Sequence, residues 1–171
     1  MTDDHEMAEF FTHQYRIVGA ARVGGQRLTD VLNDDLTSSV ELKDVQVFRL
    51  LAPRAVVESH VAALLYKKGI LFAISGEQRG SAVERRFFKH VDTTEWDVFL
   101  TLPSFELTGK FHVRGTGDLR TMLLRWVGQF IPLTSAKAVY TFYPEVAFTG
   151  DVVIVNREHM EVIGTDKALT H

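Results

Sequence analysis

Two stretches decide how this sequence folds: Tyr15–Val23, which reads YRIVGAARV, and Phe105–Val113, which reads FELTGKFHV. In the first stretch, Tyr15, Ile17 and Gly19 fall on alternate positions. This period of two is typical of a half-buried β-strand. Both stretches begin with an aromatic residue, carry a glycine in fifth place and end on valine. They therefore predict two equivalent strands.

The match between the two stretches continues along the chain. With one residue inserted in the second copy, apolar and glycine positions still coincide, in the pairs Gly25 and Gly115, Leu28 and Leu119, Leu32 and Leu123, Val40 and Ile131, and Val61 and Val152. We therefore predict an internal duplication, with a first β repeat at 6–76 and a second at 96–165. Strand-like segments Arg86–Val91 and Trp96–Leu102 indicate that the connecting segment 77–95 is partly strand, which favours one compact domain over two separate units.

Each repeat is expected to contain four strands, with one short helix after the first strand. The expected strands are Phe10–Val23, Ser39–Leu50, Ala55–Leu65 and Ile70–Ile74, then Phe105–Val113, Phe130–Phe142, Val146–Val155 and Met160–Ile163. Pro53 and Pro144 are expected in the breaks between strands, because proline cannot sit inside a central strand. The expected fold is mainly β with short helices, a duplicated barrel-like or curled-sheet unit packed as one compact body.

The sequence of the second repeat predicts a helix after its first strand. One apolar face follows from the helical spacing of Leu119, Met122, Leu123, Trp126 and Val127. Asp118 or Thr116 is expected to cap the start of this helix.

Composition excludes several classes of protein. The 171 residues are 46% hydrophobic, so a packed core is expected rather than disorder, and the formal net charge of −3 gives no global attraction for DNA or membranes. The absence of cysteine excludes disulfides, thiolate metal sites and a cysteine nucleophile. The acidic start, Met1–Glu6, differs from a signal peptide, and no apolar run is long enough to span a bilayer. We therefore expect a soluble, cytoplasmic protein.

No motif points to catalysis, and we expect no catalytic residue, metal or cofactor. The seven histidines contain no pair at metal-ligand spacing, and His13 and His112 are the pair of greatest interest. No serine stands in a nucleophile-elbow frame, and no glycine-rich stretch has the context of a phosphate loop. The carboxylate pairs Asp3–Asp4 and Asp34–Asp35 fall in polar loops.

One basic segment is a candidate ligand-binding or anion-binding site. Its cations are Arg79, Arg85, Arg86 and Lys89, with Phe87 and Phe88 among them. Basic groups interleaved with aromatic rings can hold a phosphate backbone and stack bases. The same composition also protects an edge strand from aggregation, and that interpretation is favoured here.

Two motifs carry a family resemblance. Residues 27–33, RLTDVLN, resemble the R-L-S/T-D-x-L-N turn of an uncharacterised bacterial family, and residues 130–136, FIPLTSA, resemble its F-I-P-L-T-D-A strand. The resemblance implies a structural motif and no activity. Its residues here are Arg27, Leu28, Thr29, Asp30, Leu32 and Asn33 in the first repeat, and Pro132, Leu133 and Thr134 in the second. Thr29 or Asp30 is expected to cap the helix, and Asn33 to adopt the left-handed stop conformation.

A second resemblance concerns the end of the second repeat. The run Val152–Arg157, continued through Met160 and Ile163, is similar to the closing hairpin of small Sm-like or SH3-like barrels. This resemblance implies an oligomeric or ligand-presenting barrel.

Three functions follow as hypotheses. The first is a non-enzymatic binding or regulatory module that offers a sheet edge or groove to a protein partner. The second is a nucleic-acid or nucleotide binder that uses the Arg79–Lys89 segment. The third is an enzyme with its site between the repeats. Exposed sheet edges also predict a homodimer.

Overall fold

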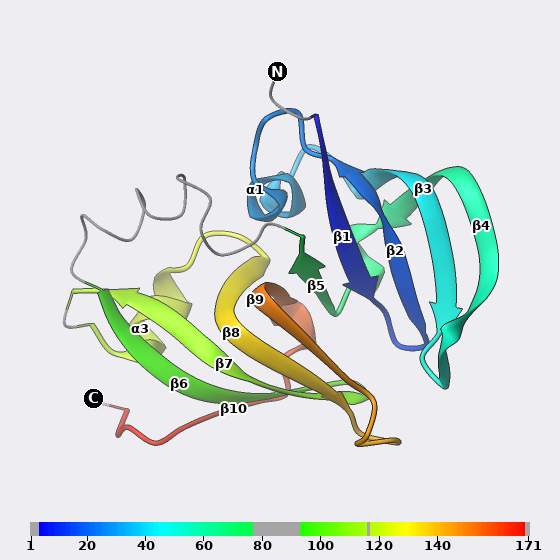
Figure 1. Ribbon diagram of the computed structural model, residues 1–171. Coiled ribbons are helices and arrows are strands. Elements are labelled where there is room, and N and C mark those ends of the chain that lie inside the picture. Colours follow the sequence, from blue (N-terminus) through cyan, green and yellow to red (C-terminus); the bar gives the residue numbers. More distant parts are fainter. Residues whose placement is uncertain (1–3, 77–92, 116, 170–171) are drawn as a thin grey trace.

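A computed structural model describes residues 4–76, 93–115 and 117–169 and is mainly β (Figure 1). The first half consists of β1 (His5–Phe11), β2 (Tyr15–Arg22), α1 (Leu28–Asn33), β3 (Ser39–Arg49), β4 (Ala52–Tyr66), the 3₁₀ turn η1 (Lys67–Gly69) and β5 (Phe72–Ser75). The second half consists of β6 (Thr93–Leu102), β7 (Phe105–Arg114), α3 (Leu119–Arg125), β8 (Phe130–Tyr140), β9 (Ala147–Asn156), η2 (Arg157–His159) and β10 (Val162–Thr165). The expected mainly-β fold with short helices is confirmed.

All ten described strands join one curled antiparallel sheet, in the order β10-β6-β7-β8-β9-β5-β1-β2-β3-β4. Strands of the first half are ordered β5-β1-β2-β3-β4, and those of the second half β10-β6-β7-β8-β9. The succession of elements is therefore the same in both halves. Its origin in a duplication stays a prediction. The halves meet where β9 pairs with β5, so β4 and β10 are the two end strands of the described sheet.

Matched glycines bend the second strand of each half. The pairing of β2 with β3 shifts register at Gly19, and the pairing of β7 with β8 shifts at Gly109. Opposite these shifts, Asp44 and Ser135 adopt left-handed φ angles of 50° and 49°. An extra residue in one strand of a pair increases its bend and twist. These bulges explain why each half curls.

The cores are shared between the halves. One cluster of buried side chains joins Phe11 and Phe72 of the first half to Phe105 of the second, and the Phe72 and Phe105 rings meet edge to face at 4.9 Å. A second cluster joins Phe130 and Ile154 of the second half to the core of the first. Burying one such aromatic side chain stabilises the fold by roughly 1.5–3 kcal/mol. The two halves therefore form one compact body, as expected.

The expected first strand is wrong in its extent. β1 ends at Phe11, a turn follows in which the Tyr15 N–H donates to Thr12 Oγ1 at 3.2 Å, and β2 begins at Tyr15. The first half consequently has five described strands rather than four. The second half also has five described strands, because β6 coincides with the expected strand-like segment Trp96–Leu102. The turn at 12–14 interrupts the apolar pattern for only three residues. For this reason the sequence pattern does not show that one strand ends at Phe11 and another begins at Tyr15.

Two local expectations about helices and breaks also need correction. Pro53 lies inside β4, which is allowed because β4 is an end strand. Val127 lies beyond the end of α3 and is exposed, so it is not part of the apolar face. Leu119 is buried, and Met122, Leu123 and Trp126 pack against the core as expected.

The start and end of α1 differ from expectation as well. Arg27 occupies the N-cap position instead of Thr29 or Asp30, and the Asp30 carboxylate accepts a long hydrogen bond of 3.4 Å from the Arg27 N–H. Asn33 belongs to the helix and has no left-handed φ. In α3, by contrast, Asp118 accepts from the Thr121 N–H at 2.8 Å, so this predicted cap is confirmed.

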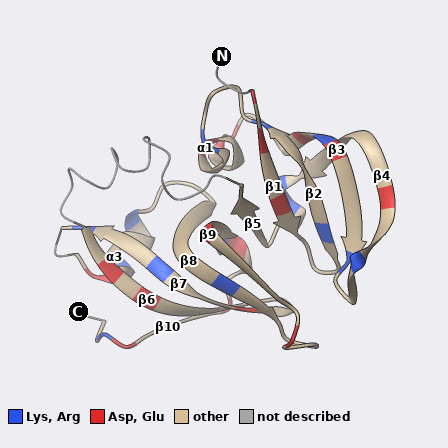
Figure 2. Ribbon diagram, in the orientation of Figure 1, with Lys and Arg blue, Asp and Glu red and all other residues tan. Residues whose placement is uncertain are grey.

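No helix among the described residues is long and apolar enough to cross a membrane. Figure 2 shows acidic and basic residues interspersed along the strands of both halves.

Candidate functional site

The clearest feature of the surface is the free edge of β4. This strand is 15 residues long, and β3 is its one neighbour among the strands that the structure describes. Several of its apolar side chains face solvent, with Val61 84% and Leu64 59% exposed, and Val56 and Tyr66 about half exposed. An edge strand presents unpaired N–H and C=O groups that can pair with another strand. Apolar side chains on such an edge are therefore unusual unless something covers them.

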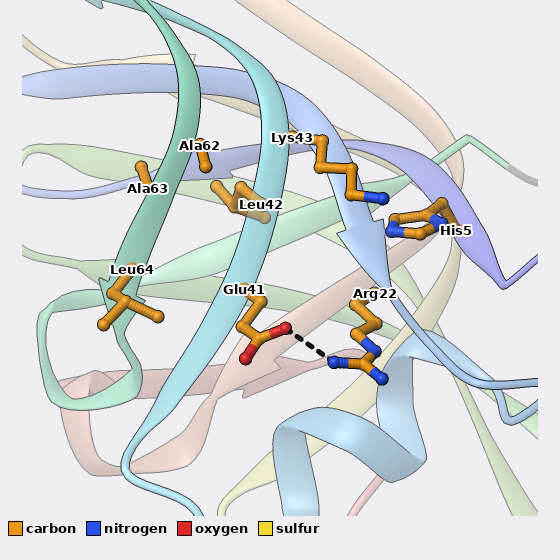
Figure 3. A pocket seen from close by; sticks show the side chains of 8 residues that line it. All are labelled: His5, Arg22, Glu41, Leu42, Lys43, Ala62, Ala63 and Leu64. Atoms are coloured by element: carbon orange, nitrogen blue, oxygen red, sulfur yellow. Dashed lines mark hydrogen bonds and ion pairs between the residues drawn. The ribbon is translucent and has the colours of Figure 1, made fainter.

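A hollow lies beside this edge, on the face formed by β1 to β4 (Figure 3). Its volume is about 430 Å³, and its lining residues are His5, Arg22, Glu41, Leu42, Lys43, Ala62, Ala63 and Leu64. Ala62, Ala63 and Leu64 belong to β4, so the hollow opens along the strand edge. Its lining is apolar next to β4 and charged next to β2 and β3.

Charged side chains define the far wall of the hollow. Arg22 donates to Glu41 across 3.0 Å, and this hydrogen bond together with the Glu41 charge raises the pKa of Arg22. Figure 3 shows the Lys43 ammonium pointing toward the His5 ring. The buried Nε2 of His5 has no hydrogen-bond partner among the described residues. The wall therefore offers the exposed cations Arg22 and Lys43 to a polar group lying along β4, whereas the buried nitrogen of His5 is not accessible to such a group.

The far end of β4 is held rigidly. The Lys67 ammonium is buried and donates to the Asp34 carbonyl and to Thr37 Oγ1, both at 2.8 Å. The Lys67 N–H donates to the Ser38 carbonyl at 3.0 Å. These bonds fix the turn after β4, so the edge is preorganised to receive a partner.

A second hollow, of about 240 Å³, lies between the halves and is where a site between the repeats would be expected. Arg27 contributes from the first half, while His112 and Thr134 contribute from the second. His112 Nε2 and Thr134 Oγ1 are 2.6 Å apart. The described lining residues include no carboxylate to orient this histidine, so the full arrangement of histidine, carboxylate and hydroxyl is not assembled from them.

The histidines of interest do not converge. His13 contacts His159, with ring centroids 5.9 Å apart, and His112 lies at Thr134 instead. Across the described ranges, no group of three or more His, Asp or Glu side chains could hold a metal ion.

The basic segment Arg79, Arg85, Arg86 and Lys89 lies outside the described residues.

The residues of the family-like motif are described, and the structure brings its two parts together. Asn33, at the end of the first part, hydrogen-bonds to the backbone of Phe130, at the start of the second. Leu28, Leu32 and Leu133 are buried, and Pro132 and Thr134 line the hollow between the halves.

Sequence reasoning missed the β4 edge, although one signal was present. Pro53 falls within a run of strand-forming residues, and proline inside a strand is typical of an edge. Which strand ends the sheet depends on contacts between distant residues, so the sequence pattern alone did not single out Val61 and Leu64.

Comparison with models of protein families, with curated protein sequences and with solved structures finds no match.

Proposed function

We propose that this chain is a non-enzymatic interaction module that binds a protein partner by pairing the partner's strand with β4. The observation that carries the proposal is the free 15-residue edge of β4 with solvent-facing Val61 and Leu64. In strand addition, main-chain hydrogen bonds supply affinity, and pockets for alternate side chains supply specificity. The hollow beside Ala62 and Leu64 is placed to supply such specificity.

A photo-crosslinking residue at position 61 tests this proposal in the source cell. We expect it to capture a defined protein, because Val61 would lie against the added strand. The same residue at position 127 is the matched control, since Val127 is also highly exposed but belongs to the segment between α3 and β8. We expect Leu64→Lys to abolish capture at position 61, because a lysine there replaces apolar contact with a charge on the edge.

Two results would contradict the proposal. One is capture of the same proteins at positions 61 and 127. The other is capture at position 61 that Leu64→Lys leaves unchanged. The non-enzymatic part has its own test: a turnover found on a broad substrate panel and lost in His112→Ala would show that the hollow between the halves is an active site.

A further inference from the structure

We infer that the strand received by β4 is β10 of a second copy of this chain, so that copies join head to tail. This inference rests on the proposed function of β4 as a strand acceptor and names the partner. The observation behind it is that the molecule already contains one such junction, between β9 and β5. The two strands left free at the ends of the sheet are the counterparts of that pair.

The internal junction shows how the two halves recognise each other. β9 and β5 pair antiparallel, with Phe72 opposite Val155, Ala73 opposite Ile154 and Ile74 opposite Val153. Beyond the strands, the Asn156 N–H donates to the Leu71 carbonyl at 2.9 Å. Backbone pairing over a few residues, with apolar side chains on both faces, is therefore one of the contacts that join one half to the next, beside the shared core of Phe72 and Phe105.

The two end strands of the described sheet, β4 and β10, occupy the same places in their halves as β9 and β5 do in theirs. β4 and β9 are both followed by a three-residue 3₁₀ turn, η1 and η2, and then by a four-residue strand, β5 and β10. β5 pairs with β1, and β10 pairs in the same way with β6. β4 is thus the counterpart of β9, and β10 that of β5. Among the described strands these two have only one neighbour each.

Exposure differs sharply between corresponding residues. With the two 3₁₀ turns aligned, Leu64 corresponds to Ile154 and Val162 corresponds to Phe72. Ile154 and Phe72 are 1% and 0% exposed, whereas Leu64 and Val162 are 59% and 55% exposed. The positions buried at the internal junction are therefore still apolar, but uncovered, at the ends of the sheet.

The same register brings compatible residues together across two copies. Val162 falls opposite Leu65, Ile163 opposite Leu64 and Gly164 opposite Ala63, so no charge is buried. Tyr15 is the counterpart of Phe105, which packs on Phe72 at the internal junction. At the junction between two copies, Val162 of the incoming strand would therefore pack on Tyr15.

Two charges at one end of the paired segments are of opposite sign. At this end, Glu161, which precedes β10, falls opposite Tyr66 and close to Lys68, and both charged residues are exposed. Opposite charges at the rim of an interface favour one register and speed association.

The junction between copies is expected to be weaker than the internal one. Val162 and Tyr15 replace two buried phenylalanines, and a chain end must also lose its freedom of motion when it binds. Association should therefore depend on concentration. Because the two surfaces are different, the contact is heterologous, and it closes into a ring or continues as a filament according to the rotation between copies.

Sedimentation and light scattering of the whole chain test the inference. The mass of the wild type should rise above 19.3 kDa as concentration increases. Leu64→Lys blocks β4 and Val162→Lys blocks β10, and each variant alone should remain at one chain mass. An equal mixture of the two variants should form a one-to-one pair, because the first retains β10 and the second retains β4. Val127→Lys is the matched control and should associate like the wild type.

Each alternative outcome is distinct. A Val162→Lys variant that still self-associates, while Leu64→Lys does not, would show symmetric β4–β4 pairing and overturn the head-to-tail arrangement, yet leave strand addition intact. A wild type that stays at one chain mass, with another protein captured at position 61, would overturn the inference and support the proposed function. Near-ultraviolet circular dichroism shows whether Leu64→Lys and Val162→Lys keep the native fold. If either variant does not, the mixing experiment is repeated with a second pair of variants, Lys68→Glu and Glu161→Lys. Each of these variants alone should associate more weakly than the mixture, and equal association would overturn the inference.

Discussion

The side-chain amide of Asn33 holds both backbone groups of Phe130. Asn33 Nδ2 donates to the Phe130 carbonyl at 2.9 Å, and Asn33 Oδ1 accepts from the Phe130 N–H at 2.8 Å. Phe130 is fully buried, and its carbonyl also accepts from Trp126 Nε1. One amide thus ties the helix of the first half to a core strand of the second.

Replacing this amide should destabilise the whole fold. In Asn33→Ala the buried Phe130 N–H loses its partner, and an unsatisfied buried donor costs about 1–3 kcal/mol. We expect that decrease in the free energy of unfolding, measured with urea. Gln26→Ala, which removes an exposed amide nearby, should change it by less than about 0.5 kcal/mol. Equal stability of the two variants would show that the Asn33 bridge contributes nothing.

This bridge also marks the limit of what the sequence predicts. The strands and short helices were predicted largely from local patterns, because alternation and helical spacing depend on neighbouring residues. Asn33 and Phe130 are 97 residues apart. A contact over this distance cannot be predicted from the spacing of neighbouring residues. The same is true of the β9–β5 junction and of the exposure of β4, because both arise from packing between distant segments. The same reason explains why Asn33 was expected to end a helix by its own backbone.

Gly109 should be intolerant of any side chain. A Cβ at this position would lie 2.7 Å from Leu133 Cδ2 and 3.0 Å from Ala136 Cβ, inside the bend of β7. We expect Gly109→Ala to lower the free energy of unfolding by about 1–3 kcal/mol through overpacking. Gly69→Ala is the control, because nothing lies within 4 Å of its Cβ position. Urea unfolding that gives both variants the same stability would contradict this account of the bulge.

Asp118 should stabilise α3 through its side chain. Its Oδ1 accepts from the Thr121 N–H at 2.8 Å, whereas Asp30, the third residue of α1, accepts from the N–H of the N-cap residue Arg27 at 3.4 Å. We expect Asp118→Ala to cost about 1 kcal/mol, the usual value for a lost N-cap, and Asp118→Asn to cost much less. Asp30→Ala should cost less than Asp118→Ala, since its hydrogen bond is long. Thermal unfolding of the three variants measures this order, and a reversed order would refute it.

Lys67 should give the protein a pH-dependent stability of defined sign. Burial lowers the pKa of Lys67 below its usual 10.5, and the charges of Asp34 and Asp35 only partly oppose this. The native state therefore releases this proton at a lower pH than the unfolded chain does. Between the two pKa values the unfolded chain binds more protons, so this group makes stability rise with pH. We expect the stability of the wild type relative to Lys67→Met to increase as the pH is raised toward 10.5. Lys67→Arg should lack the same rise, because arginine stays charged throughout. Urea unfolding at a series of pH values measures the difference, and a relative stability that falls with pH would show that Lys67 is favoured in its charged form.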